Sequence, residues 1–152
     1  MSSLNGLRAT EGLMAFRADI AIPNQPAYQR WHNNEHIPER LSIPGFVRGR
    51  RYRSVVDDTR FLMYYDTASL RVLTSAAYLA KLNAPTPRTR TALRWFENPM
   101  RTAYTLVDAL GTPERQAAPV LAVASFAPPA APRADALAGL AAIAGMQRVL
   151  EY

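Results

Sequence analysis

Strand and helix patterns follow one another along this chain in an order that restricts the fold more than any other feature of the sequence. Residues Leu13 to Ile22 alternate at a period of two, which predicts a strand that ends at Pro23. The same argument predicts three further strands, over Phe46 to Val56, Arg60 to Asp66 and Met100 to Val107. A helix after the first and the third strand gives the order β-α-β-β-α-β, which predicts an α+β, ferredoxin-like fold whose antiparallel sheet has one bare face.

The first predicted helix carries much of the chemistry of the chain. Asn24 is expected to cap it, Pro26 lies in its first turn, and Pro38 is expected to end it after Ile37. Helical spacing places five notable side chains on or near one side: Tyr28, Trp31, Glu35, His32 and His36. The two histidines are the only ones in the sequence.

The second predicted helix runs from Ala76 to Leu82, with Thr74 or Ser75 as its cap. Two prolines break it before a continuation over Thr89 to Phe96.

A partial repeat is predicted near the C-terminus. Isoleucine, glycine, arginine and tyrosine recur between Ile43 to Tyr52 and Ile143 to Tyr152, at an offset of about 100 residues. The predicted organisation is an N-terminal tail over 1–11, a ferredoxin-like unit over 12–110, a linker over 111–118 and a partial β-α-β repeat over 119–152. Either this half-unit completes the domain or a longer protein continues the repeat.

Composition narrows the class of partner. The net charge of +6 would suit nucleic acid, but the 18 basic residues are scattered and follow no nucleic-acid-binding pattern, so an anionic small molecule is the preferred partner. No apolar run reaches the ~18 residues that a membrane span requires. The absence of cysteine and of a secretory signal predicts a cytoplasmic protein.

Two segments carry a family resemblance. Glu35 to Arg53, EHIPERLSIPGFVRGRRYR, and Phe61 to Ala80, FLMYYDTASLRVLTSAAYLA, resemble the EthD-like branch of the dimeric α/β-barrel superfamily. The resemblance covers about Gly12 to Asp108 and includes a Trp-x(4)-His-x-Pro helix end. It implies a homodimer that pairs bare sheet faces around a small cavity. It also implies chemistry such as cofactor-free oxygenation, isomerisation or cyclisation.

The candidate catalytic residues are His36, Tyr64 and Arg50. His36 near a helix end could move a proton, because an imidazole titrates near neutral pH, and the resemblance favours this role. Tyr64 and Arg50 are expected to stabilise a developing oxyanion. The structural alternative is that His36 bonds a terminal carbonyl or Glu35 and only fixes the turn.

The candidate substrate-binding residues are Tyr28, Trp31, Arg17, Asp19 and His32. Tyr28 and Trp31 would line the cavity, although aromatic residues at this spacing are more often part of the core. Arg17, with a carboxylate partner, would hold a substrate oxygen, or else be solvated or paired. His32 is expected at the surface or at the rim of the pocket.

His32 to His36 spells H-x-x-E-H, a zinc motif of some metallopeptidases. The predicted sheet-based fold is not that of such enzymes, and a third ligand would have to come from a distant carboxylate. The sequence therefore predicts no metal and no organic cofactor. Two alternatives stay open: a metal held by His32 and His36, and haem iron held by His36.

These observations favour a small-molecule enzyme that performs acid/base chemistry on an aromatic or polyketide-like compound, as an isomerase, cyclase, decarboxylase or monooxygenase. The expected partners are the substrate and a second copy of the chain. The alternative is a non-catalytic ligand-binding or assembly protein of the same fold, because fold does not determine function.

Overall fold

The computed structural model describes residues 10–111, 121, 123 and 148–151. The chain divides into two compact units. One unit is Ala9–Thr105, and the other contains the described residues from Leu106 onward.

The unit Ala9–Thr105 is built on an antiparallel sheet of four strands in the order β2-β3-β1-β4. The strands are β1 (Gly12–Asp19), β2 (Phe46–Arg53), β3 (Arg60–Thr67) and β4 (Glu97–Thr105). This strand order confirms the predicted ferredoxin-like fold, in which β1 and β3 lie in the middle and the other two strands form the edges.

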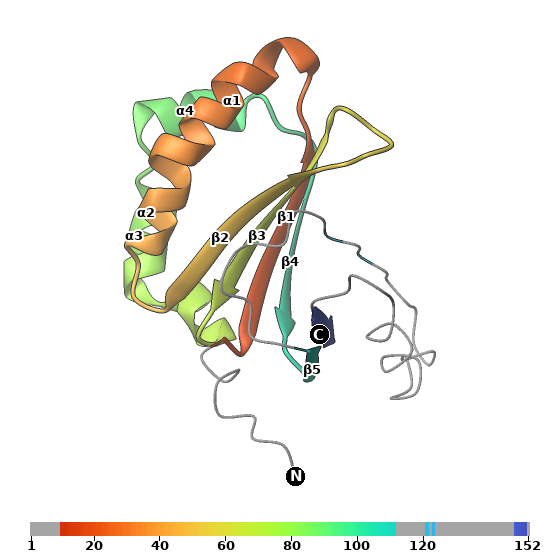
Figure 1. Ribbon diagram of the computed structural model, residues 1–152. Coiled ribbons are helices and arrows are strands. Elements are labelled where there is room, and N and C mark those ends of the chain that lie inside the picture. The colour runs from red at the N-terminus through yellow and green to blue at the C-terminus, as the bar shows by residue number, and fades with distance from the viewer. Residues whose placement is uncertain (1–9, 112–120, 122, 124–147, 152) are drawn as a thin grey trace. The chain divides into compact units, whose positions relative to one another are not determined.

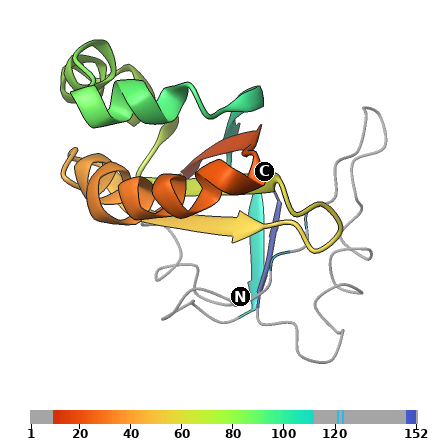
Figure 2. The same ribbon diagram turned by 90° about the horizontal axis from the view of Figure 1, so that it is seen from above.

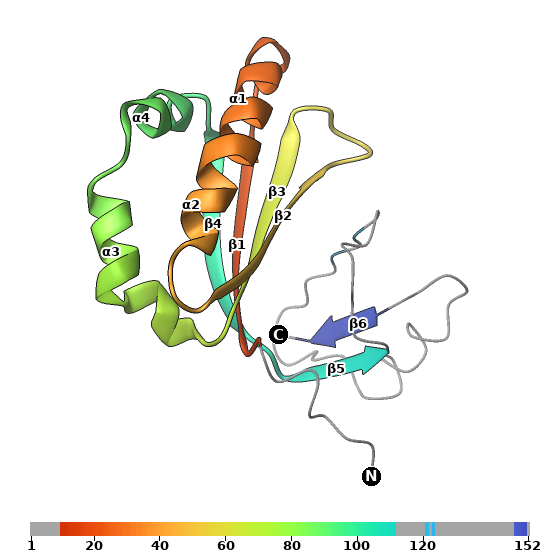
Figure 3. The same ribbon diagram turned by 60° about the vertical axis from the view of Figure 1, so that its left-hand side comes forward.

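The helices of this unit lie on one face of the sheet, as Figures 1, 2 and 3 show from three directions. They are α1 (Gln25–Trp31), α2 (Ile37–Leu41), α3 (Ala76–Asn83) and α4 (Pro87–Leu93). None of the helices in the described part of this unit covers the opposite face. Across the described residues, each helix is too short or too polar to cross a bilayer.

The helix containing Pro38 does not end there, so the predicted boundary is wrong. A π-helical turn, His32–His36, joins α1 to α2, and the Ile37 N–H donates to the carbonyl of His32 five residues earlier. Proline has no N–H, and its ring would collide with the carbonyl four residues before it in a regular α-helix. The wider turn accommodates Pro38 within the first turn of α2, and the helix continues to Leu41.

The helix caps match the predictions in part. Asn24 makes no side-chain capping bond, whereas the Ser75 hydroxyl accepts from the Tyr78 N–H at the start of α3. The helix α4 begins at Pro87 rather than after it, because Thr86 caps it by accepting from the Thr89 N–H.

The two faces of the sheet differ in chemistry. On β3 the side chains of Phe61, Met63 and Tyr65 are buried in the core beneath the helices, as the alternation predicts. The register of β2 against β3 shifts between Phe46 and Arg48. Phe46 therefore lies in the core, whereas it was predicted to share a face with Arg48, Arg50 and Tyr52.

We call the face without described helices the open face. It carries Leu62, Tyr64 and Asp66 of β3 and the residues paired with them, Tyr52, Arg50 and Arg48 of β2, Arg17, Ala15 and Leu13 of β1, and Met100, Thr102 and Tyr104 of β4.

In the other unit, β5 (Asp108–Gly111) pairs antiparallel with β6 (Arg148–Glu151). The strand β6 lies within the predicted strand Met146 to Tyr152, whereas β5 was not predicted. The predicted strand over Val120 to Phe126, apart from residues 121 and 123, and the predicted helix after Asp135 lie outside the described residues.

The turn between α2 and β2 depends on Gly45. Its φ of +94° lies in the left-handed region, and an added Cβ would lie 2.4 Å from a methyl carbon of Val72. The Phe46 N–H donates to the Ile43 carbonyl across this turn, with Pro44 between them.

Gly45→Ala should therefore lower the free energy of unfolding by about 1–3 kcal/mol, because it combines backbone strain with a steric clash. Urea denaturation of G45A, V72A and the double variant would separate the two causes. The double variant should be more stable than the sum of the single losses implies, because V72A removes only the clash. Additive losses would contradict the close contact with Val72.

Candidate active site

His32 lies in the π-helical turn, and its buried side chain contacts side chains of β2 and β3 instead of lying at the surface or at a pocket rim as predicted. Its side chain is 1% exposed, Arg51 Nη1 lies 3.1 Å from Nδ1, and Tyr65 Oη lies 2.9 Å from Nε2. A guanidinium can only donate, so Nδ1 accepts, and the proton of the neutral ring is on Nε2 and is donated to Tyr65. His32 is thereby fixed in one tautomer, and both of its nitrogens are already engaged.

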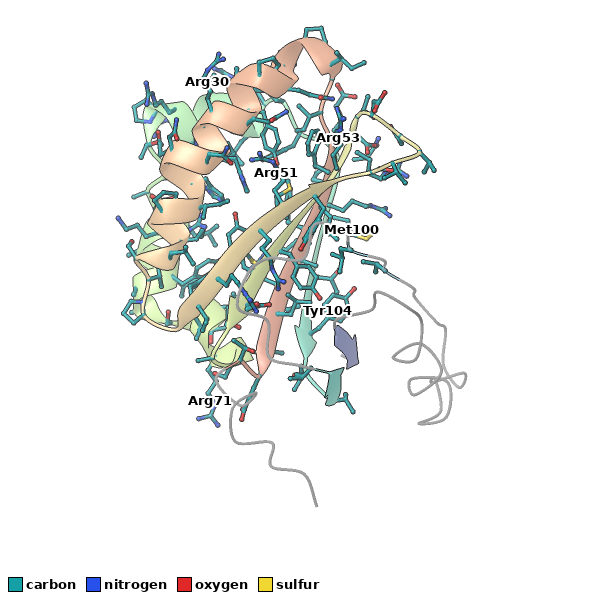
Figure 4. The ribbon with its side chains drawn as sticks, in the orientation of Figure 1. Arg30, Arg51, Arg53, Arg71, Met100 and Tyr104 are labelled. Atoms are coloured by element: carbon teal, nitrogen blue, oxygen red, sulfur yellow. The ribbon has the colours of Figure 1, made fainter. Side chains whose placement is uncertain are left out.

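The Arg51 guanidinium also contacts two other residues of the first helix. Its Nη1 donates to Asn33 Oδ1 at 2.8 Å, and its Cζ lies 5.6 Å from the centroid of the Tyr28 ring. Figure 4 shows Arg51 in the space between the sheet and this helix. Burial lowers the pKa of His32 to about 2, with further lowering by His36 and Arg51, and burial raises the pKa of Tyr65.

His36 is the less satisfied of the two histidines. Its ring packs on Trp31 with the centroids 4.6 Å apart, and its Nδ1 is buried without a hydrogen-bond partner among the described residues. The nearest carboxylate oxygen, on Glu39, is 4.0 Å away from Nδ1. Burial, and then the charge of Arg40, lowers the pKa of His36 to about 3. The imidazole is therefore neutral at pH 7, with a lone pair or an N–H available at Nδ1.

Arg40 is a site residue that the sequence analysis missed. It lies in α2 one turn after His36, is only 6% exposed, and its Nη1 is buried without a hydrogen-bond partner in the described structure. Its Cζ lies 5.3 Å from the centroid of the Tyr78 ring. The i, i+4 spacing of His36 and Arg40 could have indicated that the two residues share a helix face. The predicted end of the helix at Pro38 placed Arg40 outside the helix, so this spacing was not considered.

A polar network fixes the position of the Trp31 ring. Trp31 Nε1 donates to Thr89 Oγ1 at 3.2 Å, and Thr89 Oγ1 donates to Glu35 Oε1 at 3.3 Å. The Thr86 hydroxyl donates to the same carboxylate oxygen while it caps α4. Glu35 is thereby engaged with α4, and the Trp31 ring is held against His36.

A second charged cluster lies on the open face. Both Arg48 and Arg50 donate to the carboxylate of Asp66, at 2.9 Å for Arg48 Nε and 2.8 Å for Arg50 Nη2. The Arg50 guanidinium also lies over the Tyr64 ring, 5.2 Å from its centroid. This face is lined by Met100 and Tyr104 at the β4 edge, which Figure 4 shows on the side of the strand away from the helices.

The structure does not bring the three predicted catalytic residues together. His36 contacts Tyr65, which points toward the helices, whereas Tyr64 and Arg50 are on the open face. Neighbouring residues of a strand point to opposite faces, so the sheet separates His36 from Tyr64 and Arg50 within one chain. Within one chain these three residues therefore lie on two faces of the sheet, and their catalytic roles stay predictions.

The predicted substrate-binding residues are divided in the same way. Tyr28, Trp31 and His32 lie together beneath the helices, with ring centroids 5.5 to 6.2 Å apart. Arg17 is exposed on the open face, and Asp19 is engaged by Arg60 Nε at 3.1 Å and Asn98 Nδ2 at 3.0 Å. Tyr28 Oη is buried without a hydrogen-bond partner in the described part of the chain, so it is one of the polar groups turned toward the interior with His36 and Arg40.

The residues of the H-x-x-E-H motif are not arranged as a metal site. Within the described residues no group of three potential ligands comes together. The Nδ1 of His32 faces a guanidinium, which a cation would have to displace, and Glu35 is bound to Thr86 and Thr89.

Comparison with protein-family models and with curated proteins found no match. Solved structures share the fold. A monooxygenase from Streptomyces coelicolor in complex with nanaomycin D has a TM-score of 0.56 and 16% identity, over 74% of this chain and 100% of that one. A dimeric ferredoxin-like protein from an uncultured marine organism has a TM-score of 0.54 and 13% identity, over 70% and 96%. These likenesses show a shared ferredoxin-like α+β fold, while membership of the dimeric α/β-barrel superfamily and of its EthD-like branch stays a prediction.

Acid should destabilise this protein through its two neutral histidines, of which His32 is buried and His36 is largely buried. Their folded pKa values lie below the unfolded value of about 6.5, so the unfolded state binds more protons as the pH falls below that value. The free energy of unfolding should therefore fall between pH 6.5 and about 3, by up to about 1.4 kcal/mol per pH unit for each histidine.

Urea denaturation at a series of pH values would measure this slope. The variant His36→Gln cannot ionise in this range, so its slope should lack the contribution of His36. An identical slope in H36Q would show that His36 is not held neutral by the fold.

Proposed function

We propose that this chain is a small-molecule enzyme of the dimeric α/β-barrel type, in its EthD-like branch, that uses His36 to move a proton. The observation that carries the proposal is the Nδ1 of His36, which is buried, has no hydrogen-bond partner among the described residues, and lies one helical turn before the buried guanidinium of Arg40. A general base needs a lone pair within reach of substrate, and an oxyanion needs a nearby cation. These two groups replace the predicted combination of His36 with Tyr64 and Arg50.

The proposed chemistry needs no organic cofactor or metal. His36 Nδ1 would accept a proton from a carbon or oxygen of the substrate, and Arg40 would stabilise the negative charge left behind. The likeness in fold to a monooxygenase suits a substrate that reacts as an enolate or phenolate. Isomerisation, cyclisation and cofactor-free oxygenation of an aromatic or polyketide-like compound all begin from such an anion, whereas decarboxylation forms one when CO₂ leaves.

The low pKa of His36 in the free protein is compatible with this role, because a bound substrate would change that pKa. Burial and the charge of Arg40 make the imidazole a weak base in the free protein. An anionic substrate beside Arg40 would offset that charge and raise the pKa of His36. The base would then become effective only in the complex.

We further propose that two copies of the chain pair through the open face. One of the neighbours in fold is itself a dimeric ferredoxin-like protein. The Arg48, Arg50 and Asp66 cluster would then lie in the interface, where it would orient the two copies by charge.

His36→Ala should abolish turnover, by about 10²-fold or more, because it removes the general base. The test is product formation by liquid chromatography and mass spectrometry, with a panel of hydroxylated naphthalenes and β-keto acids in air and with a chelator present. The matched control is Asn34→Ala, an exposed position in the same turn, which should keep wild-type turnover.

Circular dichroism and thermal melting should show that H36A is folded. Equal turnover in H36A and N34A would contradict the role of His36. Saturable binding of panel compounds with no turnover in the wild type would favour the alternative, a non-catalytic binding protein.

A further inference from the structure

Two arginines converge on one tyrosine without a carboxylate. The guanidinium carbons of Arg40 and Arg101 lie 5.3 and 5.6 Å from the centroid of the Tyr78 ring. Arg40 comes from α2, Arg101 from β4 and Tyr78 from α3, so the cluster is assembled from three separate elements. Within the described residues neither arginine forms an ion pair with an acidic side chain.

The acceptors that these donors reach are uncharged. Arg101 Nη2 donates to Tyr78 Oη at 2.9 Å, and Arg101 Nε lies 3.2 Å from Met14 Sδ. The Tyr78 hydroxyl donates to the same sulfur at 3.7 Å, although a thioether is a weak acceptor. Arg40 Nη1 has no acceptor at all among the described residues. Charged donors therefore surround Tyr78, and none of the described residues supplies an anionic acceptor there.

Several other arginines of the described residues pair with acidic side chains. Arg48 and Arg50 share Asp66, and Arg60 binds Asp19 and Asp57. A buried guanidinium without an anion is costly, because desolvation is not offset by a partner. Arg40 carries this cost at 6% exposure, which is expected where an anionic ligand completes the site.

We infer that Arg40 and Arg101 bind the carboxylate of an organic anion beside Tyr78. Two guanidinium groups and a phenolic hydroxyl supply the charge-assisted donors that a carboxylate prefers. Arg101 is exposed and Arg40 is buried, so the carboxylate would enter from the solvent side of β4 and α3 and stop at α2. The ring of Phe46, a core residue, stacks on Tyr78 with the centroids 5.6 Å apart and helps to fix the position of the tyrosine.

The position of this site also indicates which part of the ligand reacts. Arg40 follows His36 by one helical turn, a rise of about 6 Å. A carboxylate on Arg40 and Arg101 would place atoms of the ligand a few bonds away near His36 Nδ1. The identification of this anion as the substrate rests on the proposed function, whereas the anion site itself does not.

The test uses benzoate as the probe and its neutral isostere benzamide as the control ligand, each titrated into the full chain and followed by NMR of the histidine rings. Only two histidines are present, so their signals are readily assigned. Benzoate should bind at least tenfold more tightly than benzamide and should raise the pKa of His36. Arg40→Gln and Arg101→Gln should each weaken benzoate binding at least tenfold.

The matched control is Arg30→Gln, which removes the same charge from an exposed position on α1, where Figure 4 shows the side chain projecting outward. R30Q should bind benzoate like the wild type. Equal affinity for benzamide, or equal losses in R30Q and R101Q, would overturn the inference. Because Arg101 is exposed, R101Q keeps the test valid if R40Q does not fold. These measurements do not depend on turnover, so an anion site without activity would count against the proposed function alone.

Discussion

The arrangement of the candidate active site depends on how the chain accommodates Pro38 inside a helix. Because proline cannot donate a hydrogen bond and crowds the preceding turn, the helix widens into the π-helical turn His32–His36 and then continues. The continuation, α2, carries Arg40 into the protein interior one turn beyond His36. If the helix ended at Pro38, the histidine would lack the neighbouring charge that lowers its pKa.

Alternation along β2 divides the chemistry of the chain between two faces. Arg50 donates to Asp66 on the open face, while its neighbour Arg51 donates to His32 beneath the helices. The same division separates Tyr64 from Tyr65. The sheet thus supports a buried site with a fixed neutral histidine on one side and a paired charge cluster on the other.

The order of elements could be predicted from periodicity, because strands repeat at two residues and helices at 3.6. The prediction that Phe46 and Arg48 share a face was wrong, because the register of β2 against β3 shifts between them. This irregularity depends on how the two strands pair, so the periodicity of the sequence does not reveal it. His36 could be identified as a candidate catalytic residue from the sequence, because histidines are rare in this chain and an imidazole titrates near neutral pH. Arg40 and Arg101 were missed because their common contact, Tyr78, joins residues that are far apart in the chain.

The network of Trp31, Glu35, Thr86 and Thr89 has a kinetic consequence. Glu35 and Thr86 are 51 residues apart in sequence, so their contact closes a long loop that contains the whole β2-β3 hairpin. Contacts of such separation form only after the loop entropy has been offset by nearer pairings. We therefore expect the Trp31 ring that packs on His36 to become fixed late in folding, and a chain whose β2-β3 hairpin has mispaired to leave the candidate active site unordered.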